Sequence, residues 1–302
     1  MNCDRHTLVA WGRLLRVPNL FTVPGDPVAG FLLASGGVLG WGVAGGIATS
    51  LCLYAAGLLL NDYFDREVDA RERPERPIPS GAVRPRTVLV AGLVLLAAGI
   101  AVALAAGGRV PGLVAAMVAV AVVAYDAALK NVKGVGQIVM GSCRAGSVLV
   151  GAAFAGAWGD PSALVAAAIA WSYTTAVTVL AAGEASGAPL GRRAFIPCLV
   201  LLLGGCAMAP FFGCAGGVRF FGIAVLGIAI LDCCAAALDV HRGRLAVPPF
   251  IGRLIRTMIA TQAAWSVWRV PADAMGAGVA IFAACALLKL GADFSARRFY
   301  GS

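Results

Sequence analysis

The feature that most constrains this chain is a repeated pattern of uncharged apolar runs, each long enough to cross a lipid bilayer. Residues 87–106, for example, read TVLVAGLVLLAAGIAVALAA, and a membrane-spanning helix needs roughly 20 mostly apolar residues. Hydrophobic residues make up 60% of the 302 and charged residues 13%, whereas soluble domains carry about 25% charged residues. The runs predict an all-α, polytopic membrane protein, and no polar stretch is long enough to form a second domain.

Nine of these runs are candidate transmembrane helices. They are 20–39, 41–60, 87–106, 110–129, 135–156, 162–182, 195–213, 218–237 and 274–292. The segment 251–267 carries Arg253 and Arg256 on a partly apolar helix, so it is a further span, a half-helix or an interfacial segment. We therefore expect about nine transmembrane helices in one domain over 1–302, with ten as the open alternative.

Lys and Arg are distributed very unevenly between the two ends of these runs. If the N-terminal segment 1–15 is cytoplasmic, 18 of the 24 fall at the cytoplasmic ends, against Arg109 and Arg219 at the other. Because positively charged loops face the cytoplasm, the net charge of +9 reports topology rather than nucleic-acid binding. We expect an integral protein of a bacterial cell (inner) membrane with its long polar loops in the cytoplasm. The nine scattered cysteines form no CxxC pair and are predicted to be apolar filler.

The acidic residues are concentrated directly after the second predicted span. Six of the fifteen lie between Asp62 and Glu75. Asp62, Asp65 and Asp69 are spaced i, i+3, i+7 and share one face if the helix continues. A cation among them would relieve their repulsion, and Mg²⁺ typically takes one or two carboxylates together with substrate phosphates. The alternative is a solvated loop that is neutralised by its own arginines, Arg66, Arg71, Arg73 and Arg76.

Several charged residues lie inside predicted spans, where a charge is costly and usually functional or paired. Arg144 is one of them, within the run QIVMGSCRAGSVLVG. Asp26 lies between Pro24 and Pro27, so it either breaks the first helix or shapes a pocket. Asp232 is either a polar group of a cavity or the partner of a buried arginine.

The acidic stretch and the residues that follow it resemble one known family. Asn61-Asp62-x-x-Asp65-x-x-x-Asp69, followed by Arg76-Pro77-x-Pro79-Ser80-Gly81, is similar to the first motif of the UbiA superfamily of intramembrane prenyltransferases. The resemblance extends over most of residues 13–292. It also includes Arg16, Pro18 and Asn19 at the start of the first span, and Tyr125, Lys130 and Asn131 at the end of the fourth.

The resemblance implies a helical bundle around a central cavity that opens to the cytoplasmic face and the bilayer. Family members bind an allylic isoprenyl diphosphate through Mg²⁺ and two aspartate-rich motifs, and a small acceptor captures the allylic group as pyrophosphate leaves. The catalytic residues implied here are Asp62, Asp65, Asp69 and Lys130; the metal ligands are Asn61, Asp62, Asp65, Asp69 and Glu184; and the substrate-binding residues are Arg16, Asn19, Asn61, Arg66, Arg76, Tyr125, Asn131 and Arg144.

The second motif of the family is reduced in this chain. The corresponding text, TVLAAGEASGAPLGRRA at 178–194, contains Glu184 and no aspartate. Thr174, Thr175 and Thr178 lie just upstream and could assist one carboxylate in holding a metal ion. Similar text occurs in bacterial members encoded in ebo clusters, which we take as the expected subgroup.

Two other classes of function stay open at this point. One is a non-catalytic binder or transporter of a polyprenyl or amphipathic ligand that retains the first motif, and the other is a structural component. Mg²⁺-dependent release of pyrophosphate from an allylic diphosphate distinguishes a transferase from both. Neither the acceptor nor the length of the isoprenyl chain can be read from the sequence, and the same holds for the oligomeric state.

Overall fold

A computed structural model describes residues 2–183, 190–211, 217–271 and 275–300, and in these ranges the regular elements are helical. The helices are α1 (Asn2–Leu14), α2 (Val17–Leu20), α3 (Gly25–Ala34), α4 (Gly42–Phe64), α5 (Arg66–Glu72), α6 (Pro85–Gly107), α7 (Arg109–Ala127), α8 (Val135–Phe154), α9 (Pro161–Ala182), α10 (Ile196–Met208), α11 (Gly217–His241), α12 (Val247–Val267) and α13 (Met275–Tyr300). Short 3-10 turns lie at Leu129–Asn131, Gly191–Phe195 and Ala209–Phe211.

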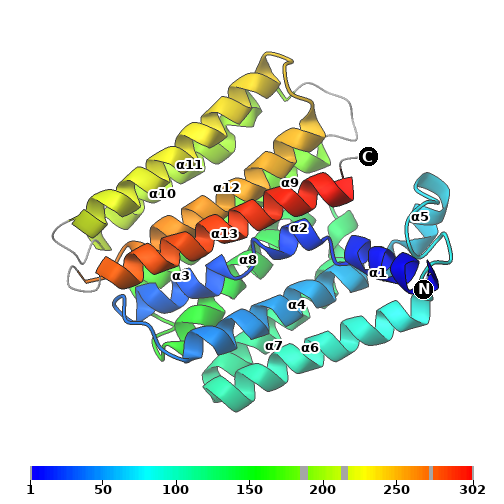
Figure 1. Cartoon of the computed structure of the whole chain (residues 1–302), viewed down its shortest axis with the longest axis horizontal. Helices are drawn as coiled ribbons and strands as arrows, with labels where there is room; N and C mark the ends of the chain where they lie inside the picture. Colours follow the sequence, from blue (N-terminus) through cyan, green and yellow to red (C-terminus); the bar gives the residue numbers. More distant parts are fainter. Residues whose placement is uncertain (1, 184–189, 212–216, 272–274, 301–302) are drawn as a thin grey trace.

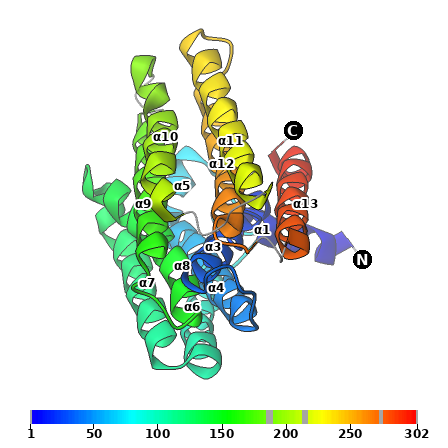
Figure 2. The ribbon, with the colours of Figure 1, turned by 90° about the vertical axis from the view of Figure 1, so that its left-hand side faces the viewer.

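The long helices lie roughly alongside one another in a single bundle (Figures 1 and 2). Helices α4, α6 and α7 form one side of it, and α10 and α11 form the opposite side. Between them, α3 packs on α8, α8 packs on α9, and α12 packs on α3, α11 and α13. The expected all-α membrane fold is confirmed. The middle of the bundle is formed by helices from the beginning, the centre and the end of the chain.

Seven helical segments in the described part of the chain are long and apolar enough to cross a membrane. They are Gly42–Phe64, Pro85–Gly107, Arg109–Ala127, Val135–Phe154, Pro161–Gly183, Gly191–Phe211 and Phe220–His241. The expected number of nine is therefore not confirmed. The open segment 251–267 belongs to α12, a continuous helix of 21 residues, and the expected last span belongs to α13.

The first expected span, 20–39, is broken. Helix α2 ends at Leu20 and α3 begins only at Gly25, after Pro24. Proline has no N–H to donate to a preceding turn, so the helix cannot run through this point. Because α3 has only ten residues, it is too short to cross a bilayer alone. Asp26 lies in the first turn of α3, next to the break. This position agrees with the alternative that Asp26 marks a break in the first helix.

Two glycines bring α3 and α8 into direct backbone contact. A Cβ atom on Gly30 would collide with the carbonyl oxygen of Val148, and a Cβ atom on Gly151 would collide with that of Pro27. Small residues permit this close approach where lipid supplies no hydrophobic drive between helices. The contact fixes the position of α3, and therefore of Asp26, relative to α8.

Buried polar side chains join α3, α8 and α12 beside this contact. The Arg144 Nε atom lies 2.6 Å from Asp26 Oδ2, and the amide of Gln262 donates to Asp26 Oδ1 at 2.6 Å. Arg144 and Gln262 both donate to the carbonyl oxygen of Thr22, at 2.6 and 2.9 Å. This group, which we call the inner network, explains how an arginine and an aspartate are accommodated in the bundle interior. Asp232 is likewise paired with an arginine, Arg253, at 2.8 Å.

Candidate functional site

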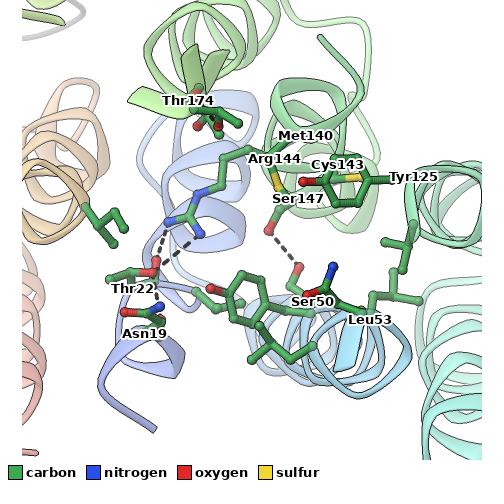
Figure 3. A pocket seen from close by; sticks show the side chains of 18 of the residues that line it. Asn19, Thr22, Ser50, Leu53, Tyr125, Met140, Cys143, Arg144, Ser147 and Thr174 are labelled. Carbon is green, nitrogen blue, oxygen red and sulfur yellow. Dashed lines mark hydrogen bonds between the residues drawn. The ribbon is translucent and has the colours of Figure 1, made fainter. Parts of the chain in front are cut away.

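A cavity of about 310 Å³ lies inside the bundle. Most of its wall is apolar, with residues such as Leu53, Val122 and Met258 contributed by α4, α7 and α12. Polar groups form the rest of the wall, and Figure 3 shows Ser50 and Ser147 joined by a hydrogen bond of 3.1 Å between their hydroxyl groups. The cavity therefore suits a mainly apolar ligand with a few polar groups.

Five of the residues predicted from the sequence and several others line this cavity. The predicted ones are Arg16, Asn19, Asn61, Tyr125 and Arg144, and Thr174 and Thr178, which the sequence suggested as groups assisting Glu184, also line it. The additional polar ones are Thr22, Ser50, Tyr54, Asp126 and Ser147. Arg144 reaches the cavity from α8 while its guanidinium remains in the inner network (Figure 3). The sequence thus predicted one polar edge of the cavity together with Thr174 and Thr178, but not the hydroxyl groups of Thr22, Ser50, Tyr54 and Ser147.

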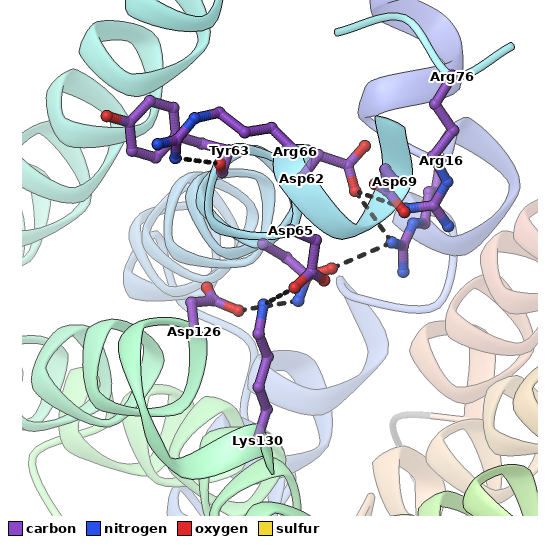
Figure 4. Close-up of polar contacts among 10 residues, drawn as sticks. Arg16, Asp62, Tyr63, Asp65, Arg66, Asp69, Arg76, Asp126 and Lys130 are labelled. Atoms are coloured by element: carbon purple, nitrogen blue, oxygen red, sulfur yellow. Dashed lines mark hydrogen bonds and ion pairs between the residues drawn. The ribbon is translucent and has the colours of Figure 1, made fainter. Parts of the chain in front are cut away.

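Charged residues gather where α4 ends, beside the cavity (Figure 4). Arg16 donates to Asn61 Oδ1 at 3.4 Å and to Asp62 Oδ1 at 3.2 Å. Its backbone has φ 43° and ψ 55°, a left-handed conformation that costs a non-glycine residue about 1–3 kcal/mol. Strain of this size persists only where surrounding contacts hold it, and here the two contacts are with the acidic motif.

The segment after the motif folds back onto it. Arg76 lies 2.7 Å from Asp69 Oδ2 and 3.7 Å from Asp62 Oδ1, so one guanidinium joins the two aspartates. Helix α4 ends at Phe64 and α5 begins at Arg66, with Asp65 between them. The expected continuation of one helix through all three aspartates is therefore interrupted. Asp62 and Asp69 are nevertheless both buried, and neither is turned outward to bulk water.

The third aspartate of the motif faces a different helix. Asp65 Oδ1 lies 2.6 Å from the Nζ atom of Lys130, which lies in the turn after α7. The amide of Asn61 donates to Asp126 Oδ1, at 3.2 Å. Asp126 is 3% exposed and was missed by sequence reasoning. A lone acid in the last turn of an otherwise apolar span, directly after Tyr125, was the signal that could have identified it.

The remaining predicted residues lie elsewhere. Arg66 turns away from the aspartates: it donates to the carbonyl oxygen of Tyr63 and lies 4.6 Å from the centre of its ring (Figure 4). Asn131 is exposed and does not line the cavity. Neither residue is brought to the site by the fold. Glu184, the predicted ligand from the reduced second motif, lies outside the described residues.

The side chains at the mouth of the cavity suit a hard divalent cation, but they do not by themselves form a complete coordination shell. In the described part of the chain, no group of three or more His, Cys, Asp or Glu side chains converges closely enough to hold a metal ion. The donors that are present, from Asn61, Asp62, Asp65 and Asp126, are carboxylate and amide oxygens. Mg²⁺ is commonly held by one or two such carboxylates, with waters and substrate phosphates completing its shell, and this arrangement fits that mode.

The sequence comparison with protein families agrees with the expected resemblance. The model of the UbiA prenyltransferase family matches residues 27–246, a range that includes α3 to α11 and the acidic motif. The chain belongs to the UbiA prenyltransferase family. The matched range covers most of the cavity wall but ends before α12, which contributes Met258 to the wall and Gln262 to the inner network.

Curated relatives are archaeal. The chain is 36% identical over 155 residues to digeranylgeranylglyceryl phosphate synthase of Natronomonas pharaonis, covering 50% of this chain and 54% of the relative. It is 38% identical over 135 residues to the synthase of the same name from Methanopyrus kandleri, covering 45% of each. The chain thus spans about half the length of the curated relatives it matches. These relatives do not support the expected placement in the bacterial ebo-cluster subgroup.

Solved structures share the fold at low sequence identity. One, described as digeranylgeranylglyceryl phosphate synthase in membranes, has a TM-score of 0.63 and 16% identity, covering 87% of this chain and 99% of that one. A UbiA homolog from Archaeoglobus fulgidus bound to GPP and Mg²⁺ has a TM-score of 0.51 and 14% identity, covering 85% and 99%. At these identities the likeness concerns the fold.

Proposed function

We propose that this protein transfers an isoprenyl group from an allylic isoprenyl diphosphate to a small acceptor within the membrane, with Mg²⁺ as its cofactor. The observation that carries the proposal is the position of the acidic motif beside a mainly apolar cavity, with Asn61 and Asp126 in the wall of that cavity. A diphosphate head needs cations and hard ligands, whereas an isoprenyl tail needs an apolar wall. Membership of the family and the Mg²⁺ and GPP bound to its A. fulgidus member support the same assignment.

The chain's own residues have separable tasks in this proposal. When bound, Mg²⁺ supplies the positive charge that stabilises the departing diphosphate. Asn61, Asp62 and Asp65 provide the oxygen ligands on the protein side. Asp62 pairs with Arg16, and Asp65 pairs with Lys130. With these carboxylates as metal ligands, the guanidinium group of Arg16 and the ammonium group of Lys130 would be available to contact phosphate oxygens.

Two further residues belong to the substrate side of the proposal. Tyr125 and Asn19 line the cavity near the aspartates, where the reacting carbon of the donor would lie. The electron-rich face of a tyrosine ring attracts a cation, so Tyr125 is suited to the positive charge that develops on the allylic group. Its effect would fall on the rate of ionisation rather than on the affinity for the diphosphate.

The acceptor and the orientation in the membrane are also part of the proposal. The relatives' name makes a glyceryl phosphate lipid the first acceptor to test. The concentration of Lys and Arg at the end that carries the aspartates supports a site facing the cytoplasm. We infer residence in the cell membrane, where the donor's head group can reach the site from the cytoplasm while its tail remains among the helices.

The test measures Mg²⁺-dependent pyrophosphate release by the full chain in lipid nanodiscs, with allylic diphosphates of several lengths and with glyceryl phosphate or neutral alcohol acceptors. Asp62→Asn is expected to lower the rate about 100-fold or more, the size found when one preorganised charge-stabilising group is lost. Asp239→Asn, which removes the same charge from a half-exposed position on α11, is the matched control and keeps the rate. Equal rates in both variants would exclude the site, and Mg²⁺-dependent lipid binding without release would favour a binder.

A further inference from the structure

Among the described residues at the mouth of the cavity, the carboxylates outnumber by one the basic residues that contact them. The acids are Asp62, Asp65, Asp69 and Asp126, and the bases that contact them are Arg16, Arg76 and Lys130. We call these seven residues the mouth cluster. With every group ionised it carries one negative charge in excess. Three of its carboxylates, those of Asp62, Asp69 and Asp126, are buried at the end of membrane-crossing helices, where an uncompensated charge is costly. An excess of this sign favours the binding of a cation at the mouth.

The excess charge falls on Asp126. Among the described residues, no Lys or Arg nitrogen lies within ion-pair distance of its carboxylate, whereas each of the other three acids has at least one such partner. Its hydrogen bond comes from the neutral amide of Asn61. It is 3% exposed and lines the cavity. A carboxylate in this position is short of a cation and faces the space that a ligand would fill.

Asp126 also lies beside the predicted metal ligands rather than apart from them. Asn61 contacts it directly, and Asp65 and Lys130 lie within electrostatic range of it. In Figure 4 the side chains of Asp126 and Asp65 lie on either side of the tip of Lys130. A cation that replaced this ammonium group would have two carboxylates from two helices within reach.

We propose that Asp126 is a metal-binding carboxylate of this site, acting with Asp65 on one divalent cation. The proposal rests on the proposed function, because the cation is the Mg²⁺ that the donor requires. A divalent cation changes the mouth cluster from one negative to one positive charge, which is the sign that attracts a diphosphate. Asp126 supplies a ligand from α7, a helix on which sequence reasoning placed only Tyr125.

The experiment measures binding of Mn²⁺, as a paramagnetic substitute for Mg²⁺, to the full chain in nanodiscs without any donor. Electron paramagnetic resonance gives the free Mn²⁺ concentration directly. Asp126→Asn keeps the size of the side chain and is expected to weaken Mn²⁺ binding at least tenfold, within the 10–100-fold range seen when groups supporting a metal site are lost. Asp126→Glu, which retains a carboxylate, is expected to recover most of the affinity, and Asp239→Asn is the matched charge control.

The unfolding temperature, measured in the presence of a chelator, gives a second readout. Asp126→Asn is expected to weaken metal binding without lowering this temperature. Removal of an uncompensated buried charge relieves a desolvation cost, so Asp126→Asn is expected to unfold at the same temperature as the native chain or higher. If Asp126→Asn binds Mn²⁺ as tightly as Asp239→Asn, the inference is wrong while the proposed function stands. If the native chain binds no Mn²⁺, with or without pyrophosphate, the proposed function itself is wrong.

Discussion

Asp26 and Asp126 are both buried carboxylates on membrane helices, with exposures of 2% and 3%, yet their surroundings differ. Asp26 has an arginine at 2.6 Å and a hydrogen bond from Gln262. Asp126 has a hydrogen bond from an amide and, among the described residues, no ion-pair partner. Burial alone therefore does not separate a structural carboxylate from a functional one. The useful distinction is whether the protein has already supplied the opposite charge.

The inner network and the mouth cluster differ in the same respect, namely whether each carboxylate already has a positively charged partner. In the inner network, Arg144 and Gln262 meet Asp26 and the Thr22 carbonyl without help from a ligand. In the mouth cluster, the carboxylates outnumber the bases that contact them, and we propose that a cation supplies the balance. We expect substitutions in the inner network to change stability first, and substitutions in the mouth cluster to change metal binding and turnover first.

The largest stability effect is expected from Arg144→Met, which leaves the Asp26 carboxylate buried without its partner. Removal of one partner from a buried ion pair costs about 3–5 kcal/mol. The measurement is thermal unfolding of the purified chain in detergent. The double variant Asp26→Leu/Arg144→Met should recover most of the loss, because apolar residues of similar volume often replace a buried pair without penalty. A single variant as stable as the native chain would remove the contrast with Asp126.

A smaller effect is expected from Gly151→Ala, which tests how the inner network is held in register. The added methyl group would collide with the carbonyl oxygen of Pro27, so α3 must shift relative to α8 and carry Asp26 away from Arg144. Overpacking of this kind costs about 1–3 kcal/mol. Gly227→Ala on α11, where no atom beyond the local backbone of its own helix lies within 4 Å of the new methyl group, is the matched control. Equal unfolding temperatures in the two variants would show that the backbone contact is unimportant.

The smallest effect is expected at Asp160, a more exposed carboxylate outside the spans. Its side chain caps α9 by accepting hydrogen bonds from the backbone N–H groups of Ser162 and Ala163, and it pairs with Arg269 at 3.0 Å. Replacement of an aspartate cap by alanine costs about 1 kcal/mol. Asp160→Ala should therefore lower the unfolding temperature at neutral pH by a small but measurable amount.

The same carboxylate predicts the pH dependence of that effect. Burial raises the pKa of Asp160, but the hydrogen bonds from Ser162 and Ala163 and the charge of Arg269 together bring it below its usual 3.8. A lowered folded-state pKa means that the contribution is present above pH 3.8 and is lost as the pH falls through the folded value. The difference between native chain and Asp160→Ala should shrink in acid. A difference that stays constant with pH would contradict this assignment.

The sequence predicted the elements whose signals are local. Long apolar runs such as 87–106 became helices with almost the expected limits, and the clustered acids identified the polar end of the bundle. The first span was misjudged because hydropathy averages over Pro24, which interrupts the helix regardless of how apolar its neighbours are. Asp126 was missed for the related reason that a single acid hardly changes the average of a 20-residue window.

Pairing between distant residues was beyond the sequence. Arg144 was correctly expected to be functional or paired, but nothing in the sequence links it to Asp26, 118 positions earlier. Arg66 and Arg76 each follow an acidic residue in the sequence, yet of these two only Arg76 reaches Asp62 and Asp69. The difference depends on how residues 73–83 turn back toward α4, and that path is set by tertiary contacts.

The break between α2 and α3 has a consequence for how the chain is assembled during synthesis. It leaves the Thr22 carbonyl without a helical partner, and one of the two groups that satisfy it, the amide of Gln262, comes 240 residues later. The other group, Arg144, comes 122 residues later, so both contacts form only after much of the chain has been translated. The complete set of contacts on the earliest membrane segment therefore requires α8 from the middle of the chain and α12 from near its end.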